Sequence, residues 1–222
     1  MLVNSPIERA SAGWQGDAAA GRYVGPRFRT ARAAGRDGKL VLHLLRRLRA
    51  GAGSSILDLP CGTGRLAGAL LPVASFYVGA DVSGAMLGEA RNAHDAPLAQ
   101  ASAAALPFAD NSFDVIVCCR LLHHLRGGAE LATVLRELVR VSRRLVIASF
   151  FDGASWGAWR RRIGVRREGR SRRAISRQAM EAAVAQAGAQ ILGYAHSLRF
   201  VSQQVFFAAE KGHAESHAAH AR

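Results

Sequence analysis

Residues that can hold a nucleotide-like ligand gather where a short apolar strand runs into a glycine turn. The run Ile56-Leu57-Asp58-Leu59 leads through Pro60-Cys61 into Gly62-Thr63-Gly64, and apolar residues at helical spacing follow. Glycines let a backbone approach a ligand closely, and a doubly wound sheet binds ligands at the carboxyl ends of its strands. Asp58 lies inside the strand, where a carboxylate is costly unless it meets a polar or cationic partner. The stretch predicts a site for a ligand with a cationic end.

A second acid follows at the carboxyl end of the next predicted strand, residues 76–81. Asp81 comes nineteen residues after Gly62, a spacing typical of the acid that accepts hydrogen bonds from both ribose hydroxyls. Ser83 is placed to cap the helix that begins after it. The segment 62–67 also fits the dinucleotide pattern G-x-G-x-x-G/A. Asp58 decides between the two interpretations, because a dinucleotide fold has no particular use for an acid at that depth.

Three stretches together resemble the class I S-adenosylmethionine (SAM) methyltransferases. Residues 56–64 resemble motif I, with the form hydrophobic-Leu-Asp-x-Gly-x-Gly-x-Gly, although Pro60 stands where the first glycine is usual. Residues 81–87 read Asp-x-Ser-x-x-Met-Leu, and residues 106–114 carry Leu-Pro-Phe followed by Asp-Asn-Ser-Phe-Asp. Proline fixes φ and lacks an N–H, so the turn must rely on Gly62 and Gly64. The resemblance covers about residues 39–151 and extends more weakly to 210.

The resemblance implies a set of cofactor contacts with SAM. Asp58 would serve the aminoacyl end, Asp81 would hold the ribose, and Met86 would pack on the adenine. Ser102-Ala103 stands where similar proteins carry Asp-Ala, so the adenine amino group would meet an acceptor without charge. The expected cofactor-binding residues are Asp58, Cys61, Gly62, Gly64, Asp81, Met86, Ser102, Ala103 and Cys119.

Two histidines after the fourth predicted strand are the candidate catalytic residues. By the same resemblance, His123 and His124 open the acceptor side of the site. A histidine there can take a proton from a hydroxyl or amine acceptor, since its pKa lies near neutrality. The alternative is that the pair only packs or hydrogen-bonds. No metal site is expected, because the three cysteines, Cys61, Cys118 and Cys119, fit no metal spacing.

The order of predicted elements indicates an α/β fold. We expect a doubly wound, Rossmann-like sheet of seven mostly parallel strands with helices on both faces, closed by an antiparallel strand pair. Amphipathic helices are predicted over residues 39–49 and 130–141, and a helix capped by Ser176 ends near Gly188. The domain should occupy residues 39–210 and include an arginine-rich insertion at 152–175. Residues 1–38 would form an N-terminal arm and possible lid, and 211–222 a disordered tail.

The chain has a formal net charge of +14, and nearly all of its positive charge is arginine. Residues 160–173 contain eight arginines, which can bind an anionic substrate or the backbone of RNA, or simply solvate an insertion. Because the arginine excess runs through the whole chain, the charge favours a small-molecule acceptor over RNA. No apolar run reaches the length of a membrane span, and the N-terminus shows no signal sequence, so a cytoplasmic protein is expected.

The predicted function is a SAM-dependent methyltransferase acting on a small molecule. Against an RNA methyltransferase, no Asn/Asp-Pro-Pro-Tyr/Phe motif follows the fourth strand. Against a dehydrogenase, the sequence lacks a Tyr-x-x-x-Lys pair in the expected region. A SAM-binding protein without transferase activity stays open as a third alternative. The acceptor and the oligomeric state are not determined by the sequence.

Overall fold

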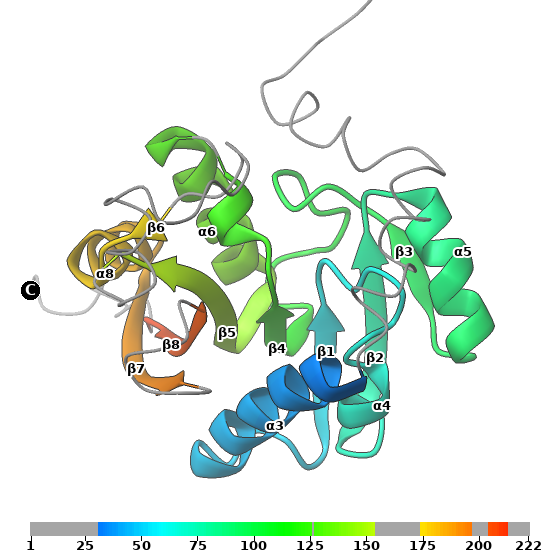
Figure 1. The fold of residues 1–222 in the computed structure, drawn as a ribbon. Coiled ribbons are helices and arrows are strands. Elements are labelled where there is room, and N and C mark those ends of the chain that lie inside the picture. Colours follow the sequence, from blue (N-terminus) through cyan, green and yellow to red (C-terminus); the bar gives the residue numbers. More distant parts are fainter. Residues whose placement is uncertain (1–30, 126, 154–173, 197–203, 213–222) are drawn as a thin grey trace, which may run out of the picture.

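A central β-sheet organises the protein in a computed structural model that describes residues 31–125, 127–153, 174–196 and 204–212. Its strands run in the spatial order β3-β2-β1-β4-β5-β8-β7, and a short β6 pairs with β5 beside this path (Figure 1). β8 is antiparallel to both neighbours, while the other described pairs are parallel. The strand bounds are β1 Ser54–Asp58, β2 Ala74–Asp81, β3 Leu98–Gln100, β4 Phe113–Cys118, β5 Ser142–Asp152, β6 Ala174–Ile175, β7 Ala189–His196 and β8 Gln204–Lys211.

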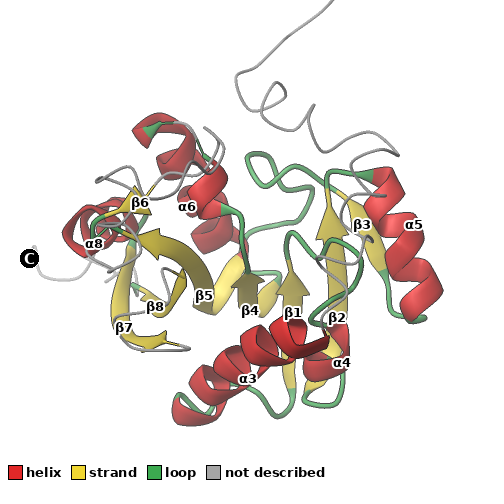
Figure 2. Ribbon diagram, viewed as in Figure 1, coloured by secondary structure: helices red, strands yellow, loops and turns green. Residues whose placement is uncertain are grey.

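Helices cover both faces of this sheet. On one face α3 and α4 pack against the apolar side chains of one core cluster, and α6 and α8 pack on a second cluster across the sheet. Figure 2 shows α3 on the near face, crossing the strands. Each face is closed by an amphipathic stripe, such as the buried Leu131, Leu135 and Leu138 of α6. The helix bounds are α3 Ala31–Arg47, α4 Ala67–Leu70, α5 Gly84–Ala93, the 3₁₀ helix η1 Leu122–His124, α6 Gly128–Val141 and α8 Arg177–Gln186.

The predicted doubly wound, mostly parallel α/β sheet is confirmed, with two corrections. The described sheet has eight strands rather than seven, because residues 174–175 at the end of the predicted insertion pair with β5. The first helix of the described residues, α3, begins at Ala31 rather than at Lys39, so it extends into the segment expected to be an arm. The rest of that arm, the arginine-rich stretch 160–173 and residues 213–222 lie outside the described residues. In the described part of the chain, no helix is long and apolar enough to cross a membrane.

The strand order has a topological switch point between β1 and β4. β1 lies in the middle of the parallel strands, and β2 and β4 pair with it on opposite sides. The chain therefore leaves β1 toward β2 on one side and later returns to place β4 on the other. Such a topological switch point opens a ligand crevice outside the carboxyl ends of the strands. Asp58 and Asp81 end β1 and β2, and Cys119 directly follows β4, so all three lie at this one edge of the sheet.

Arg140 of helix α6 holds the segment that contains the Leu-Pro-Phe and Asp-Asn-Ser-Phe-Asp motifs. The Arg140 guanidinium donates to the carbonyl oxygens of Leu106 and Phe108 at 3.0 and 2.8 Å. It also pairs with Asp110 at 2.8 Å and with Glu137 at 2.7 Å, and Glu137 accepts from the Leu106 N–H. These contacts hold the segment between β3 and β4 in place against α6, so the family-like motif has a structural role here.

Replacing Arg140 by alanine is expected to lower the free energy of unfolding by about 1–3 kcal/mol, because partly buried carbonyls lose a charged donor. Urea denaturation followed by circular dichroism measures the loss. Arg136 on the same helix is exposed and bonds only Thr133 among the described residues, so Arg136→Ala is the matched control. The control should change the free energy by less than about 0.5 kcal/mol. Equal losses in the two variants would contradict the assigned role of Arg140.

Candidate functional site

The glycine turn after β1 adopts a conformation that only glycine takes without strain at two positions. Gly62 has φ 56° and Gly64 has φ 76°, both in the left-handed region. A Cβ added at Gly62 would meet nothing within 4 Å, so the turn faces open space there. A Cβ at Gly64 would lie 2.8 Å from Nε2 of His94, at the end of α5. Gly62 therefore leaves room for a ligand, while Gly64 allows the turn to pack on α5.

Asp58 is completely buried at the carboxyl end of β1. The Tyr77 hydroxyl donates to its Oδ2 at 3.1 Å, and Oδ1 has no hydrogen-bond partner among the described residues. Burial raises the pKa of Asp58 to about 7, against the lowering effects of the Tyr77 hydrogen bond and the Arg65 charge. A buried carboxylate oxygen without a partner is costly in the free protein. A cationic or hydrogen-bond-donating ligand group would remove that cost.

Asp81 lies at the carboxyl end of β2, next to the glycine turn. Its carboxylate accepts from the Gly62 N–H and from the Ser83 N–H, both at 2.9 Å. Burial raises the pKa of Asp81, while the hydrogen bonds from Ser83 and Gly62 oppose that rise. The Ser83 hydroxyl caps α5 by accepting from the Met86 N–H at 3.3 Å. Asp81 therefore fixes the glycine turn against the start of α5, beside the space that Gly62 leaves.

The three residues expected at the adenine lie around the ends of β3 and α5. Met86 is buried in the first turn of α5. Ser102 follows β3, and its hydroxyl accepts from the Ala104 N–H at 3.3 Å within its own turn. Ala103 is partly buried against the core on the same turn. Their contacts to an adenine stay a prediction.

Cys61, after β1, and Cys119, after β4, are buried free thiols. Burial raises the pKa of both, that of Cys119 to about 11, so neither is a thiolate at neutral pH. Cys119 contacts Nη2 of Arg65 at 3.4 Å. These thiols can line the site as small, weakly polar walls, and the geometry offers them no nucleophilic role.

His123 and His124 form most of the 3₁₀ turn η1 after β4. The buried His123 ring stacks on Phe151 of β5 with centroids 3.9 Å apart and planes 6° from parallel. The His124 ring lies 4.3 Å from that of His123. Stacking on Phe151 fixes the orientation of the His123 ring. Such a fixed ring is as compatible with a packing role as with a role as a general base. Their catalytic role stays a prediction.

The structure adds an ionic cluster that the motifs do not contain. Oδ2 of Asp37, on α3, lies 2.7 Å from Nη1 of Arg65 and 2.9 Å from Nε of Arg120. Arg65 directly follows the glycine turn, and Arg120 directly follows Cys119. The sequence could have indicated both arginines as site residues, because one follows the glycine turn and the other follows a predicted cofactor-binding cysteine. Asp37 could not, because it lies before the predicted helix.

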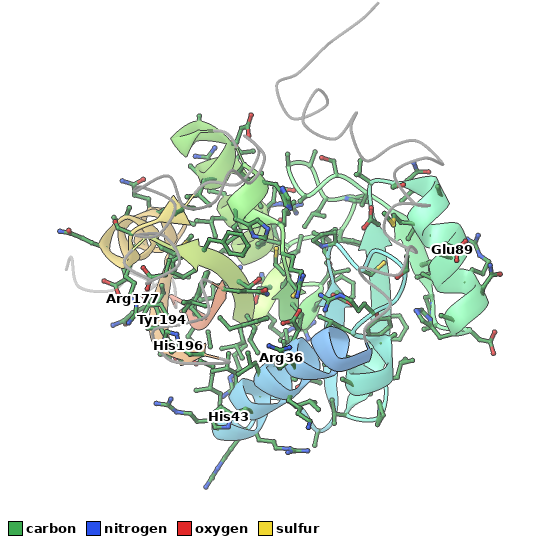
Figure 3. All side chains as sticks on the ribbon, in the orientation of Figure 1. Arg36, His43, Glu89, Arg177, Tyr194 and His196 are labelled. Carbon is green, nitrogen blue, oxygen red and sulfur yellow. The ribbon has the colours of Figure 1, made fainter. Side chains whose placement is uncertain are left out.

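A second cluster of polar side chains lies far from the glycine turn. Figure 3 labels Arg177, Tyr194 and His196 beside α8 and β7, at the opposite end of the molecule from Glu89 on α5. The Arg177 guanidinium lies 5.0 Å from the Tyr194 ring centroid and 2.8 Å from the Asp152 carboxylate. This group ties α8 to β7 and β5. In the described ranges no set of three or more His, Cys, Asp and Glu side chains is arranged to hold a metal ion.

The strand order, the glycine turn after β1 and the acids ending β1 and β2 are the features expected of a class I, SAM-dependent methyltransferase domain. Residues 57–147 match the family model described as "Methyltransferase domain". A demethylmenaquinone methyltransferase of Corynebacterium urealyticum is 37% identical over 108 residues, which are 47% of this chain and 45% of the relative. The ubiquinone/menaquinone biosynthesis C-methyltransferase UbiE of Hahella chejuensis is 37% identical over 112 residues, 45% of this chain and 44% of the relative. The chain thus matches less than half the length of either relative.

Solved structures agree on the fold. The magnesium protoporphyrin IX methyltransferase of Synechocystis with bound SAH, S-adenosylhomocysteine, has a TM-score of 0.71 at 18% identity, covering 85% of this chain and 89% of that one. The [4+2]-cyclase SpnF has a TM-score of 0.64 at 16% identity, covering 79% of this chain and 81% of that one. Transferases and a cyclase therefore share this architecture. The activity of this chain must be inferred from its site residues and not from the fold.

Proposed function

We propose that this protein binds SAM in the crevice at the ends of β1, β2 and β4 and transfers its methyl group to a small-molecule acceptor. The observation that carries the proposal is the unpartnered, fully buried Oδ1 of Asp58 beside a glycine turn that faces open space. A dinucleotide brings phosphates toward such a turn, where a carboxylate would repel them. An aminoacyl ligand brings an ammonium group instead, which is the partner that Asp58 lacks.

When bound, SAM supplies a methyl group on a cationic sulfonium, and transfer to an acceptor atom forms one bond while the carbon–sulfur bond breaks to leave a neutral thioether. The protein must align the acceptor and exclude water. Asp58 would hold the ammonium group and Asp81 the ribose, so the two acids would fix the two ends of the cofactor. The buried Cys61 and Cys119 thiols would keep water from the crevice.

A small-molecule acceptor is supported by the names of the relatives, which are quinone-biosynthesis methyltransferases. The identity spans less than half of those proteins, so their substrates do not transfer directly to this chain. The test for methyl transfer is incubation of the purified full chain with isotopically labelled SAM and cellular metabolite extract, with and without total RNA. Label in a small molecule supports the proposal, and label in RNA alone would replace its acceptor class. Binding of SAM with no label in either pool would indicate a non-catalytic SAM-binding protein.

Ligand preference gives the direct test of the cofactor. SAM and SAH should bind with dissociation constants on the order of micromolar, whereas NADH and NADPH should not bind at that level. Isothermal titration calorimetry of all four ligands against the same protein preparation measures this. Tighter binding of NADH than of SAM would end the methyltransferase proposal and favour the dinucleotide interpretation of residues 62–67.

A further inference from the structure

Arg120 is held in place from two directions at the carboxyl end of β4. Its backbone has φ 65°, a left-handed conformation that is uncommon for a residue with a side chain. The buried Ser149 hydroxyl, on neighbouring β5, accepts from the Arg120 N–H at 2.8 Å. Ser149 in turn accepts from the Gln204 amide at 3.3 Å, at the start of β8. Residues of β5 and β8 thus fix the Arg120 backbone, and its side chain reaches Asp37, which also binds Arg65 after the glycine turn.

The Arg120 guanidinium has one edge bound and one edge available. Nε donates to Asp37 at 2.9 Å, and no described residue accepts from Nη1 or Nη2. The Arg120 side chain is 28% exposed, so part of it is accessible to a ligand. Two guanidinium nitrogens in one plane present the geometry that binds a carboxylate with two parallel hydrogen bonds.

The ion pairs of Asp37 with Arg65 and Arg120 leave the positive charge only partly neutralised. Asp37 carries one negative charge and is shared by two arginines, Arg65 and Arg120, which leaves one net positive charge. A monoanionic group would balance it, and a carboxylate does so with the planar geometry that a guanidinium matches. A dianionic phosphate would exceed the balance. The planar free edge of Arg120 therefore favours a monoanionic carboxylate.

The position of Arg120 assigns this carboxylate to the acceptor rather than to the cofactor. Asp58 and Asp81 lie at the ends of β1 and β2, and the charges that act on Asp58 are those of Arg65 and Asp81. Arg65 directly follows the glycine turn, where the cofactor is proposed to bind. Arg120 lies two residues before η1, whose His123 and His124 are the residues expected on the acceptor side.

We propose that Arg120 binds a carboxylate group of the methyl acceptor, and that Asp37 and Ser149 position its guanidinium for that contact. The inference rests on the proposed function and names a substrate class for it: small molecules that carry a carboxylate beside the nucleophilic atom. In this proposal Arg120 is a specificity-determining residue, because it binds the carboxylate and not the nucleophilic atom.

The test uses the full chain saturated with SAH and two pairs of probes, benzoate with benzamide and 4-hydroxybenzoate with 4-hydroxybenzamide. Each pair differs in charge at nearly constant shape. Ligand-observed NMR titrations should show the carboxylates binding at least about tenfold tighter than the amides. In Arg120→Gln the preference should fall to less than about threefold while SAH affinity stays within about threefold, and Arg120→Lys, which keeps the charge, should retain part of it. The exposed Arg136→Gln is the matched control and should keep the full preference.

Three results would overturn the inference, and each of them identifies a different assumption as wrong. If the unmodified protein binds SAH but prefers no carboxylate, the acceptor class is wrong while the proposed function stands. If Arg120→Gln weakens SAH but not its decarboxylated analogue, the guanidinium holds the cofactor's own carboxylate. If the unmodified protein binds neither SAM nor SAH, the proposed function itself fails. Retained SAH affinity in Arg120→Gln shows that the variant is folded, and Arg120→Lys provides a second variant if it is not.

Discussion

Replacing Asp58 by asparagine is expected to stabilise the ligand-free protein above pH 7 and to weaken SAM binding about 10- to 100-fold. A pKa raised from 3.8 to about 7 corresponds to a folding penalty on the order of 4 kcal/mol for the charged carboxylate. Asparagine removes the charge but buries an amide donor that costs about 1–3 kcal/mol. The net gain in the free energy of unfolding at pH 8 should therefore be about 1–3 kcal/mol.

The sign of the pH dependence follows from the direction of the shift. Between pH 4 and pH 7 the folded protein keeps the Asp58 proton that the unfolded chain has lost. The contribution of Asp58 to stability is therefore fully present below about pH 4, falls as the pH rises, and is lost above about pH 7. Because Tyr77 and the charges of Arg65 and Asp81 stay in both variants, the difference between wild type and Asp58→Asn isolates this one carboxyl group.

Urea denaturation of both proteins from pH 4.5 to 8.5 measures the stability difference, and calorimetry measures SAM binding. Binding to wild type should tighten between pH 5.5 and 7, because a cationic ligand favours the charged form of Asp58, and a proton should be released on binding. Calorimetry in buffers with different ionisation enthalpies detects that proton. A stability difference that is independent of pH, or unchanged SAM affinity in Asp58→Asn, would remove Asp58 from the cofactor site.

Replacing Asp81 by alanine is expected to weaken SAM binding by about 1–3 kcal/mol, through the loss of charge-assisted hydrogen bonds to the ribose. The same substitution should lower the free energy of unfolding by about 1–3 kcal/mol, because the N–H groups of Gly62 and Ser83 lose their acceptor. Ser102→Ala should cost less binding free energy, since its hydroxyl is uncharged and already bonded within its turn.

A double-mutant cycle separates the ribose contact from the structural role of Asp81. SAH and 2′-deoxy-SAH are titrated against wild type and against Asp81→Asn, which keeps one acceptor oxygen for the backbone. If Asp81 holds the ribose, removal of the 2′-hydroxyl should weaken binding to wild type about tenfold and to the variant by much less. Equal losses in both proteins, or a larger effect of Ser102→Ala, would show that the ribose lies elsewhere.

Much of this fold was predictable because its signals are local. The amphipathic stripe of α6 and the serine caps of α5 and α8 lie within a few residues of the elements they specify, and each is present in the structure. The carboxyl ends of β1 and β2 were also predictable as neighbours, since successive parallel strands point the same way. Asp58 and Asp81 therefore belong to one site by sequence reasoning alone. Their ligand contacts remain predictions.

Contacts between distant segments were decided only by the tertiary structure. β6 pairs with β5 over two residues, too short a segment for any periodicity to mark. Asp37, Arg65 and Arg120 come from three separate elements, and nothing in their local sequence says that one carboxylate will serve two arginines. The sequence by itself determined most of the helices and strands, and which edge of the sheet carries the acids. The packing of α3 over β1 and β4 decided which charged side chains meet there, because side-chain contacts depend on helix position and strand register across the whole sheet.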